Sequence, residues 1–317
     1  MKRFVALALA WLLFVPQGFG WGEDGHRWIN RAAALSMPAD YPQFMKEPRA
    51  IDELEYLGPE PDRWRSPTEP SLKNSQEPDH YIDLELLQDF GPLPVKRYEF
   101  MQRLAEFQRQ QSMKNSPIAA SLTPDKVGMQ PWIVAEVWER LIVAFREYRQ
   151  LKAAGKPTFT AEHTAIMYAG WLGHYVADGS NPMHTSVQYN GWTGANPNGY
   201  TTAKTTHSMF ESVNVHDNVK PQEIRSGMRV AKALYGEEQA QAGGWQAEWS
   251  AYLDYLRESN GLIEQTYKLE KAGGFRGAGT PEGHKFTADR MRAGAQMLAD
   301  LWYTAWVQSA VPLPTAS

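Results

Sequence analysis

The chain has 317 residues, of which 43% are hydrophobic and 21% charged, a composition typical of globular rather than disordered or fibrous proteins. Its formal net charge is −4, so it is not expected to coat nucleic acid through an excess of Lys and Arg. It contains no cysteine, which excludes disulfides, thiolate zinc sites, iron–sulfur clusters and cysteine nucleophiles. Any metal must therefore be bound by His, Asp, Glu or backbone groups.

Residues 1–20 have the pattern of a secretory signal peptide. A basic start precedes an apolar run over residues 4–15, which is too short to span a bilayer because a spanning helix needs about 20 residues. Gly18 and Gly20 are small residues in the positions expected before a cleavage site ahead of Trp21. We expect the mature protein to begin at Trp21, to be secreted or periplasmic, and to offer the free α-amine of Trp21 as a metal ligand.

The rest of the chain predicts an all-α protein, with residues 21–317 forming a single helical domain. Apolar residues recur at helical spacing in several long segments bounded by Gly or Pro. The predicted helices cover residues 24–37, 95–114, 131–151, 160–178, 245–271 and 286–311. Residues 58–78 and 188–206 are predicted as long irregular loops, and loops of that length in a compact domain are usually functional. The tail from Pro312 is expected to be loose.

Two histidine–carboxylate pairs have the spacing of metal ligands. His174 and Asp178 are four residues apart on the predicted helix 160–178, so their side chains leave the same helix face, and His207 and Glu211 repeat this spacing. About one such pair is expected by chance, and for either pair taken singly a surface ion pair on a helix is the favoured interpretation. The pairs gain weight because other potential ligands accompany them, namely Trp21, His26, Asp62, His80 and His184.

This order of residues resembles the superfamily of zinc-dependent phospholipases C and single-strand-specific nucleases, which includes the fungal and plant 3′-nucleotidase/nuclease type. The resemblance runs from Trp21 to Glu211, about two thirds of the mature chain. The matching segments are Trp21-Gly22-x3-His26, Asp62-x2-Arg65, Asp79-His80-Tyr81-Ile82-Asp83, Gly173-His174-Tyr175-Val176-Ala177-Asp178, Asn181-Pro182-Met183-His184 and His207-Ser208-Met209-Phe210-Glu211.

The resemblance implies three bound zinc ions. The first would be bound by Asp62, His80, His174 and Asp178. The second would be bound by the α-amine and carbonyl of Trp21, by His26 and by the other oxygen of a bridging Asp178. The third would be bound by His184, His207, Glu211 and water. Nitrogen and oxygen ligands of this kind suit Zn²⁺. The remaining histidines, His163, His216 and His284, match nothing and are interpreted as ordinary core or surface residues.

The implied activity is hydrolysis of phosphate esters by a hydroxide that bridges two zinc ions, without a side-chain nucleophile. Asp62 and Asp178 are the predicted catalytic carboxylates. Arg65 is a candidate phosphate contact because its guanidinium is planar, although a surface loop residue would look the same in the sequence. Single-stranded nucleic acid or phospholipid is the expected substrate. No protein partner is implied, and we expect a monomer.

The motifs divide between the two branches of the superfamily. The short spacing from Trp21 to His26 and the long gap from His184 to His207 resemble the nucleases. In contrast, Glu211 resembles the phospholipases, because the nucleases carry Asp there, and the Asp-x-Gly-Gly-Asn stretch of many nucleases is absent. We favour a single-strand nuclease that releases 5′-nucleotides. The first alternative is a phospholipase C acting on phosphatidylcholine-like lipids, and the second is a non-catalytic secreted protein that binds zinc or glycans.

The loop 188–206 carries the predicted substrate-binding residues, Tyr189, Trp192 and Tyr200. Their rings could stack on bases, at about 1–3 kcal/mol for each base. They could equally surround a choline cation or simply hold the loop in place. The sequence leaves these three interpretations open.

Overall fold

The computed structural model describes residues 21–235 and 246–311, so the predicted signal peptide and the tail from Pro312 lie outside the described residues. The described residues form helices and loops without a strand, as predicted for an all-α protein. No described helix is both long enough and apolar enough to cross a membrane.

The α-helices are α1 (Gly22–Ala34), α2 (Gln43–Lys46), α3 (Pro48–Leu57), α4 (Glu60–Arg63), α5 (Pro70–Gln76), α6 (Arg97–Met113), α7 (Pro124–Val127), α8 (Gln130–Ala153), α9 (Phe159–Ser180), α10 (Thr206–Ser208), α11 (Asn214–Asn218), α12 (Pro221–Ser226), α14 (Gln246–Asn260), α15 (Ile263–Lys271) and α16 (Pro281–Gln308). Shorter helical turns are η1 (Glu77–His80), η2 (Leu84–Leu87), η3 (Ala119–Ser121), η4 (Pro182–His184) and η5 (Met209–Val213), the last of them π-helical.

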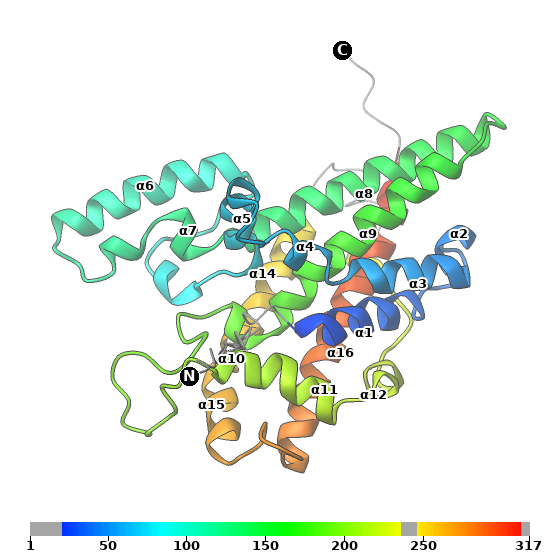
Figure 1. Ribbon diagram of the computed structural model, residues 1–317. Helices are drawn as coiled ribbons and strands as arrows, with labels where there is room; N and C mark the ends of the chain where they lie inside the picture. The colour runs from blue at the N-terminus through cyan, green and yellow to red at the C-terminus, as the bar shows by residue number, and fades with distance from the viewer. Residues whose placement is uncertain (1–20, 236–245, 312–317) are drawn as a thin grey trace, which may run out of the picture.

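The long helices α8, α9 and α16 form the centre of the molecule (Figure 1). Buried tryptophans join them, because an indole combines a large apolar surface with one hydrogen-bond donor. Trp138 on α8 donates to the carbonyl oxygen of Leu301 on α16 at 2.9 Å, and Trp302 on α16 donates to that of Ala169 on α9 at 3.1 Å. These contacts hold α9, which carries two of the predicted metal ligands, in the middle of the core.

A close approach of α1 to α9 brings the first part of the chain to the same place. Gly173 on α9 faces Asn30 on α1, and a Cβ at residue 173 would lie 1.9 Å from the Asn30 Oδ1 atom. The buried Asn30 amide donates to the carbonyl oxygens of Leu54 on α3 at 2.9 Å and Gly170 on α9 at 3.0 Å. Only glycine at residue 173 allows this spacing. As a result the ring of His26 on α1 stacks on that of His174, with centroids 3.9 Å apart.

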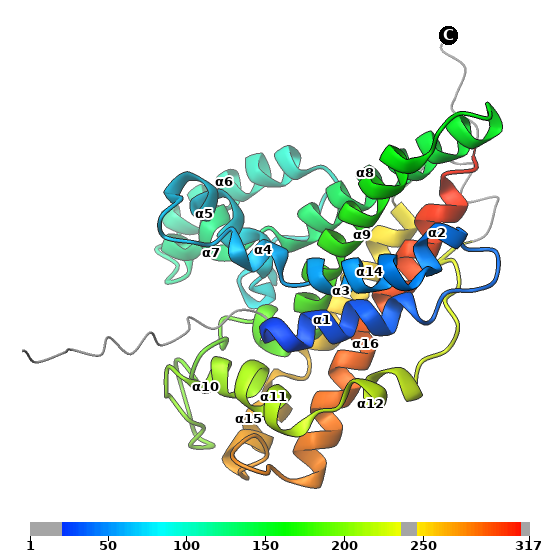
Figure 2. The ribbon, with the colours of Figure 1, turned by 45° about the vertical axis from the view of Figure 1, so that its right-hand side comes forward.

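Figures 1 and 2 show α4, α5, α6 and α7 on one side of the N-terminal end of α1, with α10 and α11 on the other side. Candidate residues from both sides can therefore meet next to α1.

Five of the predicted helices correspond to observed ones. The predicted ranges 24–37, 95–114, 131–151, 160–178 and 286–311 match α1, α6, α8, α9 and α16 in that order. The last of these begins earlier than predicted, at Pro281, because the Thr280 side chain caps it by accepting from the Gly283 amide at 3.1 Å.

Two predictions about elements were wrong. Residues 58–78 are not an irregular loop but contain α4, α5 and the start of η1, each with proline in its first turn. Proline is compatible with a first turn because the amide there needs no helical partner. The predicted helix 245–271 is divided into α14 and α15 at Gly261, since glycine is a poor helix former. Its first residue, Trp245, lies outside the described residues. Residues 188–206 are irregular, as predicted, up to the start of α10 at Thr206.

Candidate metal centre

The structure brings the four residues of the predicted first site together. Asp62 comes from α4, His80 from the end of η1, and His174 and Asp178 from α9. The His80 Nδ1 atom lies 3.0 Å from the His174 Nε2 atom, and these two atoms lie 3.1 and 3.3 Å from the Asp178 Oδ2 atom. Asp62 Oδ1 is 3.7 Å from both nitrogens. Ligands of a tetrahedral zinc ion lie about 3.3 Å apart, so the spacing fits such an ion.

The predicted second site lies on the other side of Asp178. The His26 Nε2 atom is 3.2 Å from the main-chain nitrogen of Trp21 and 3.4 Å from Asp178 Oδ1. The Trp21 side chain is fully buried, and its indole nitrogen donates to Ala177 O and Ser180 Oγ, both at 2.8 Å. The two oxygens of Asp178 therefore face two different groups of nitrogens, which is the geometry of a bridging carboxylate.

The predicted third site is formed by His184 on η4, His207 on α10 and Glu211 in the π-helical turn η5. The Nε2 atoms of His184 and His207 are 3.0 Å apart. Glu211 Oε2 lies 3.5 Å from the first and 2.5 Å from the second. Within the described parts of the chain, three His/Asp/Glu groups could hold a metal ion, and this is one of them. The other two, Asp62 with His80 and His174, and His26 with His174 and Asp178, differ from the predicted sets in that they share His174.

Backbone carbonyls set the tautomers of three of these histidines. A carbonyl oxygen only accepts hydrogen bonds, so a ring nitrogen bonded to it must carry the hydrogen. The opposite Nε2 atom of each ring then offers its lone pair to the cluster, as metal-binding histidines do. The pairs are His174 Nδ1 with Gly58 O at 2.8 Å, His184 Nδ1 with His80 O at 2.7 Å, and His207 Nδ1 with Tyr189 O at 2.9 Å.

Burial lowers the pKa of most imidazoles in the cluster, whereas for His174 burial is outweighed by Asp178 and Asp62, which raise its pKa. Burial, reinforced by the nearby Arg65, lowers the pKa of His80 to about 3, and burial lowers the pKa of His207 to about 4. Although burial opposes the charged form, neighbouring histidines keep the pKa of Asp178 well below its ordinary value. Burial raises the pKa of Glu211 to about 8, so without a cation this carboxyl keeps a proton at neutral pH.

The residues of the cluster fit a divalent metal. Asp62 Oδ2, Asp178 Oδ1 and Glu211 Oε1 are buried oxygens that have no hydrogen-bond partner among the described residues. Leaving such an oxygen unpaired costs free energy, and a cation placed between it and the imidazole lone pairs removes that cost. The donor set of imidazole nitrogens and carboxylate oxygens suits Zn²⁺. That these residues bind zinc remains our prediction.

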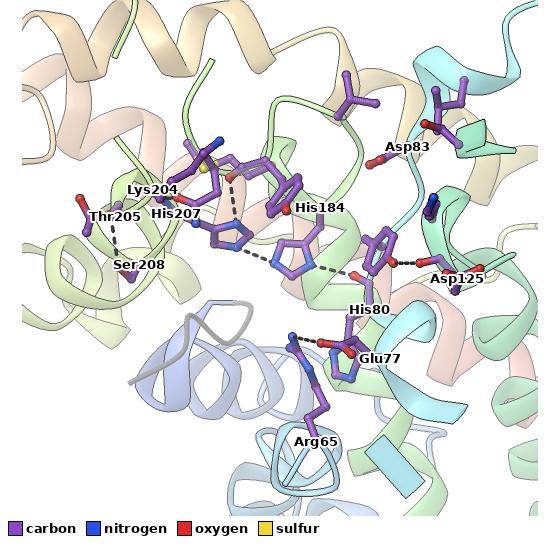
Figure 3. Close-up of a pocket in the computed structure, with 18 residues that line it drawn as sticks. Arg65, Glu77, His80, Asp83, Asp125, His184, Lys204, Thr205, His207 and Ser208 are labelled. Atoms are coloured by element: carbon purple, nitrogen blue, oxygen red, sulfur yellow. Dashed lines mark hydrogen bonds and ion pairs between the residues drawn. The ribbon is translucent and has the colours of Figure 1, made fainter. Parts of the chain in front are cut away.

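The clusters border a pocket of about 700 Å³, which is lined by His80, His184 and His207 (Figure 3). Arg65, the predicted phosphate contact, also lines it. The Arg65 guanidinium donates to Asp62 Oδ1 at 3.2 Å and lies 4.0 Å from Glu77 Oε1. Arg65 is therefore oriented by one of the candidate ligands and lines the pocket beside it.

The three predicted substrate-binding aromatics have different positions. Tyr189 lines the pocket and is 55% exposed, so its ring is available to a ligand. Trp192 and Tyr200 pack instead against Tyr267 on α15, with ring centroids 5.2 and 5.9 Å from it. The Tyr200 hydroxyl donates to Glu264 Oε1 at 2.8 Å. Trp192 and Tyr200 thus pack the loop against α15.

Sequence reasoning missed several residues that line the pocket. Tyr81 and Asp83 lie in a segment that matched the superfamily, so they could have been found there. Asp83 is nearly buried, and burial raises its pKa to about 8. Asp125 and Lys204 carry no local signal, because only tertiary packing brings them to the pocket. The three unmatched histidines lie at the surface in ion pairs, as His163 with Glu53, His216 with Asp24 and His284 with Glu223.

Comparisons with known proteins give a distant likeness. No protein-family model and no curated protein sequence matches the chain. Among solved structures, the alpha toxin from Clostridium absonum is similar, with a TM-score of 0.47 and 14% identity over 90% of this chain. The alpha-toxin of an avian strain of Clostridium perfringens has a TM-score of 0.43 and 12% identity over 92% of this chain. The chain spans 65% of the length of each toxin. Likenesses at this level assign neither a family nor an activity.

Proposed function

We propose that the protein is a zinc-dependent phosphodiester hydrolase of the phospholipase C and single-strand nuclease superfamily, acting as a single-strand nuclease that releases 5′-nucleotides. The observation that carries the proposal is the convergence of three groups of imidazole and carboxylate ligands beside one pocket. The order of these ligands along the chain supports the same superfamily. We further propose that the enzyme is an exported monomer that begins at Trp21.

The residues of the chain have distinct parts in this proposal. The Asp178 carboxylate serves two ligand groups, while Asp62 completes one of them and orients Arg65. The Arg65 guanidinium binds the phosphate of the substrate, since it is planar and already directed at the pocket. Bound zinc supplies Lewis-acid activation of water and of the phosphate. Burial of Asp62 and Asp178 keeps bulk water away from these charges, which strengthens their electrostatic effect.

Aromatic and carboxyl side chains that line the pocket support a nucleic acid substrate. Tyr81 and the exposed Tyr189 offer rings on which a base could stack. Asp83 lines the same pocket and keeps a proton near neutral pH, because burial raises its pKa to about 8. A protonated carboxyl both donates and accepts hydrogen bonds, which matches the paired donor and acceptor edges of bases.

A phospholipase C acting on phosphatidylcholine-like lipids is the second candidate. Glu211 matches the phospholipase branch, and the pocket end with the Tyr81 ring and Asp125 could accept a choline cation. A non-catalytic zinc-binding protein is less well supported. The third group has three protein ligands, whereas structural zinc normally has four.

The test is nucleotide release from single-stranded RNA by zinc-loaded protein that begins at Trp21, with zinc content measured on the same sample. Phosphatidylcholine vesicles are the parallel substrate. We expect 5′-nucleotides from RNA and no release of phosphocholine. An Arg65→Gln variant should retain its zinc but lose most of the activity. If zinc-loaded protein releases phosphocholine and leaves RNA intact, the nuclease proposal is wrong.

A further inference from the structure

The pocket has two ends of different chemistry. Figure 3 shows Lys204, Thr205 and Ser208 beyond His207, on the side away from Asp83 and Asp125. Cationic and hydroxyl groups therefore lie at one end, and two carboxyl groups lie at the other. Lys126 also lines the pocket, next to Asp125, so the carboxyl end has a cation of its own.

Lys204 is held in place without neutralisation of its charge. Its exposed ammonium donates to the main-chain oxygen of Asn190 at 2.9 Å, and no carboxylate among the described residues forms an ion pair with it. The Asn190 side-chain oxygen in turn accepts from the main-chain amide of His207 at 3.3 Å. Asn190 thus connects the Lys204 ammonium to the backbone of His207, a predicted metal ligand.

We propose that Lys204, with the hydroxyls of Thr205 and Ser208, binds a second phosphate of the substrate, next to the phosphate that is hydrolysed. Lysine binds phosphate as a point charge, and serine and threonine hydroxyls are common phosphate contacts. The Ser208 hydroxyl donates its one hydrogen to Thr205 O at 3.2 Å, so on binding it would turn from that oxygen to the phosphate. This inference rests on the proposed function and specifies it.

This second phosphate site, formed by Lys204, Thr205 and Ser208 and called the subsite below, implies a substrate that is a chain with successive phosphates. A phosphatidylcholine-like lipid carries one phosphate and a cationic head group, so it offers nothing anionic to Lys204 once its phosphate is at the zinc ligands. A nucleic acid strand offers a phosphate at every nucleotide. With its phosphate at the zinc ligands, such a strand would reach Lys204 with the next phosphate and the Tyr81 end with a base. The site should therefore prefer a trinucleotide to a dinucleotide.

The experiment compares wild type, Lys204→Ala and Lys126→Ala. Lys126 is a matched control, because it is also exposed, also lines the pocket and also donates to a main-chain oxygen, that of Ala120 at 2.9 Å. The substrates are the deoxythymidine dinucleotide TpT, which has one phosphate, and the trinucleotide TpTpT, which has two. A binding measurement uses a fluorescent phosphorothioate oligo-dT at several salt concentrations.

We expect Lys204→Ala to lower the ratio of kcat/KM for TpTpT to that for TpT about fivefold, with TpT itself little changed. The slope of log affinity against log salt should fall in magnitude by about 0.7, the value for one single-strand phosphate contact. Lys126→Ala should have the same kcat/KM ratio and the same salt slope as wild type. Lys204→Arg keeps the positive charge, so its ratio and slope should lie close to those of wild type.

Two results would overturn the inference. If wild type cleaves TpT but Lys204→Ala changes the ratio and the slope no more than Lys126→Ala does, the subsite is wrong while the proposed function stands. If zinc-loaded wild type cleaves neither TpT nor TpTpT, the proposed function fails and the subsite fails with it.

Discussion

Replacing Asp178 by asparagine tests whether one carboxylate serves two metal ions. Its Oδ2 atom faces His80 and His174, and its Oδ1 atom faces His26. Asparagine has nearly the same shape but no charge, and its amide nitrogen cannot act as a ligand. We therefore expect Asp178→Asn to lose two of the three predicted zinc ions, and to lose more activity than any single histidine variant.

The size of the effect on stability follows from binding linkage. An ion at about 100 times its Kd stabilises the folded state by about 2.7 kcal/mol, so loss of two ions removes about 5 kcal/mol. The entropy of unfolding grows with chain length, so a change of 1 kcal/mol shifts the Tm of a domain of about 300 residues by roughly 2 °C. The increase in Tm caused by added zinc should therefore be about 10 °C smaller in Asp178→Asn than in wild type.

Metal analysis of dialysed protein and thermal melts with and without zinc provide the measurements. Glu211→Gln is the comparison, because Glu211 contacts only the third group, and it should lose one ion. Asp24→Asn is the control, because Asp24 pairs at the surface with His216 and should lose none. If Asp178→Asn retains as many ions as Glu211→Gln, Asp178 is not a bridging ligand.

Three further predictions concern the N-terminus, the metal and the pH. A protein with two extra residues before Trp21 should lose one zinc ion and most activity, since an amide replaces the α-amine, and full metal content with full activity would contradict this. Chelation should lower the Tm by about 5 °C for each ion removed, so an unchanged melt would count against bound metal. In metal-free protein, the raised pKa of Asp83 means that its contribution to stability is present at low pH and is lost as pH rises through about 8. Urea unfolding from pH 5 to pH 9 should therefore show a smaller decline for Asp83→Asn than for wild type, and parallel curves would refute the assignment.

The ligand pairs could be predicted because their spacing is local. Four residues on an α-helix place two side chains on one face whatever the tertiary structure, so His174 and Asp178 were identifiable from their separation. The long amphipathic helices α8, α9 and α16 were predictable for the same reason. The helices α4 and α5 were not, because proline and polar residues are common in loops as well as in first helical turns.

Other parts of the site depend on contacts between distant residues. Lys204 is oriented by the carbonyl of Asn190, 14 residues away in sequence, and Tyr81 donates to the carbonyl of Asp125, 44 residues away. The aromatic composition of loop 188–206 did not show which ring faces the pocket. Which ring faces the pocket depends on Tyr267 on α15. The Tyr267 ring packs against Trp192 and Tyr200, whereas Tyr189 remains exposed.

His80 takes part in two of the ligand groups by different atoms. Its side chain belongs to the first group, while its main-chain oxygen accepts from His184 Nδ1 and so orients a ligand of the third. The groups are therefore not separable modules that could be redesigned one at a time. A substitution that shifts the backbone at residue 80, made to change the metal preference of one group, would also rotate an imidazole of the other.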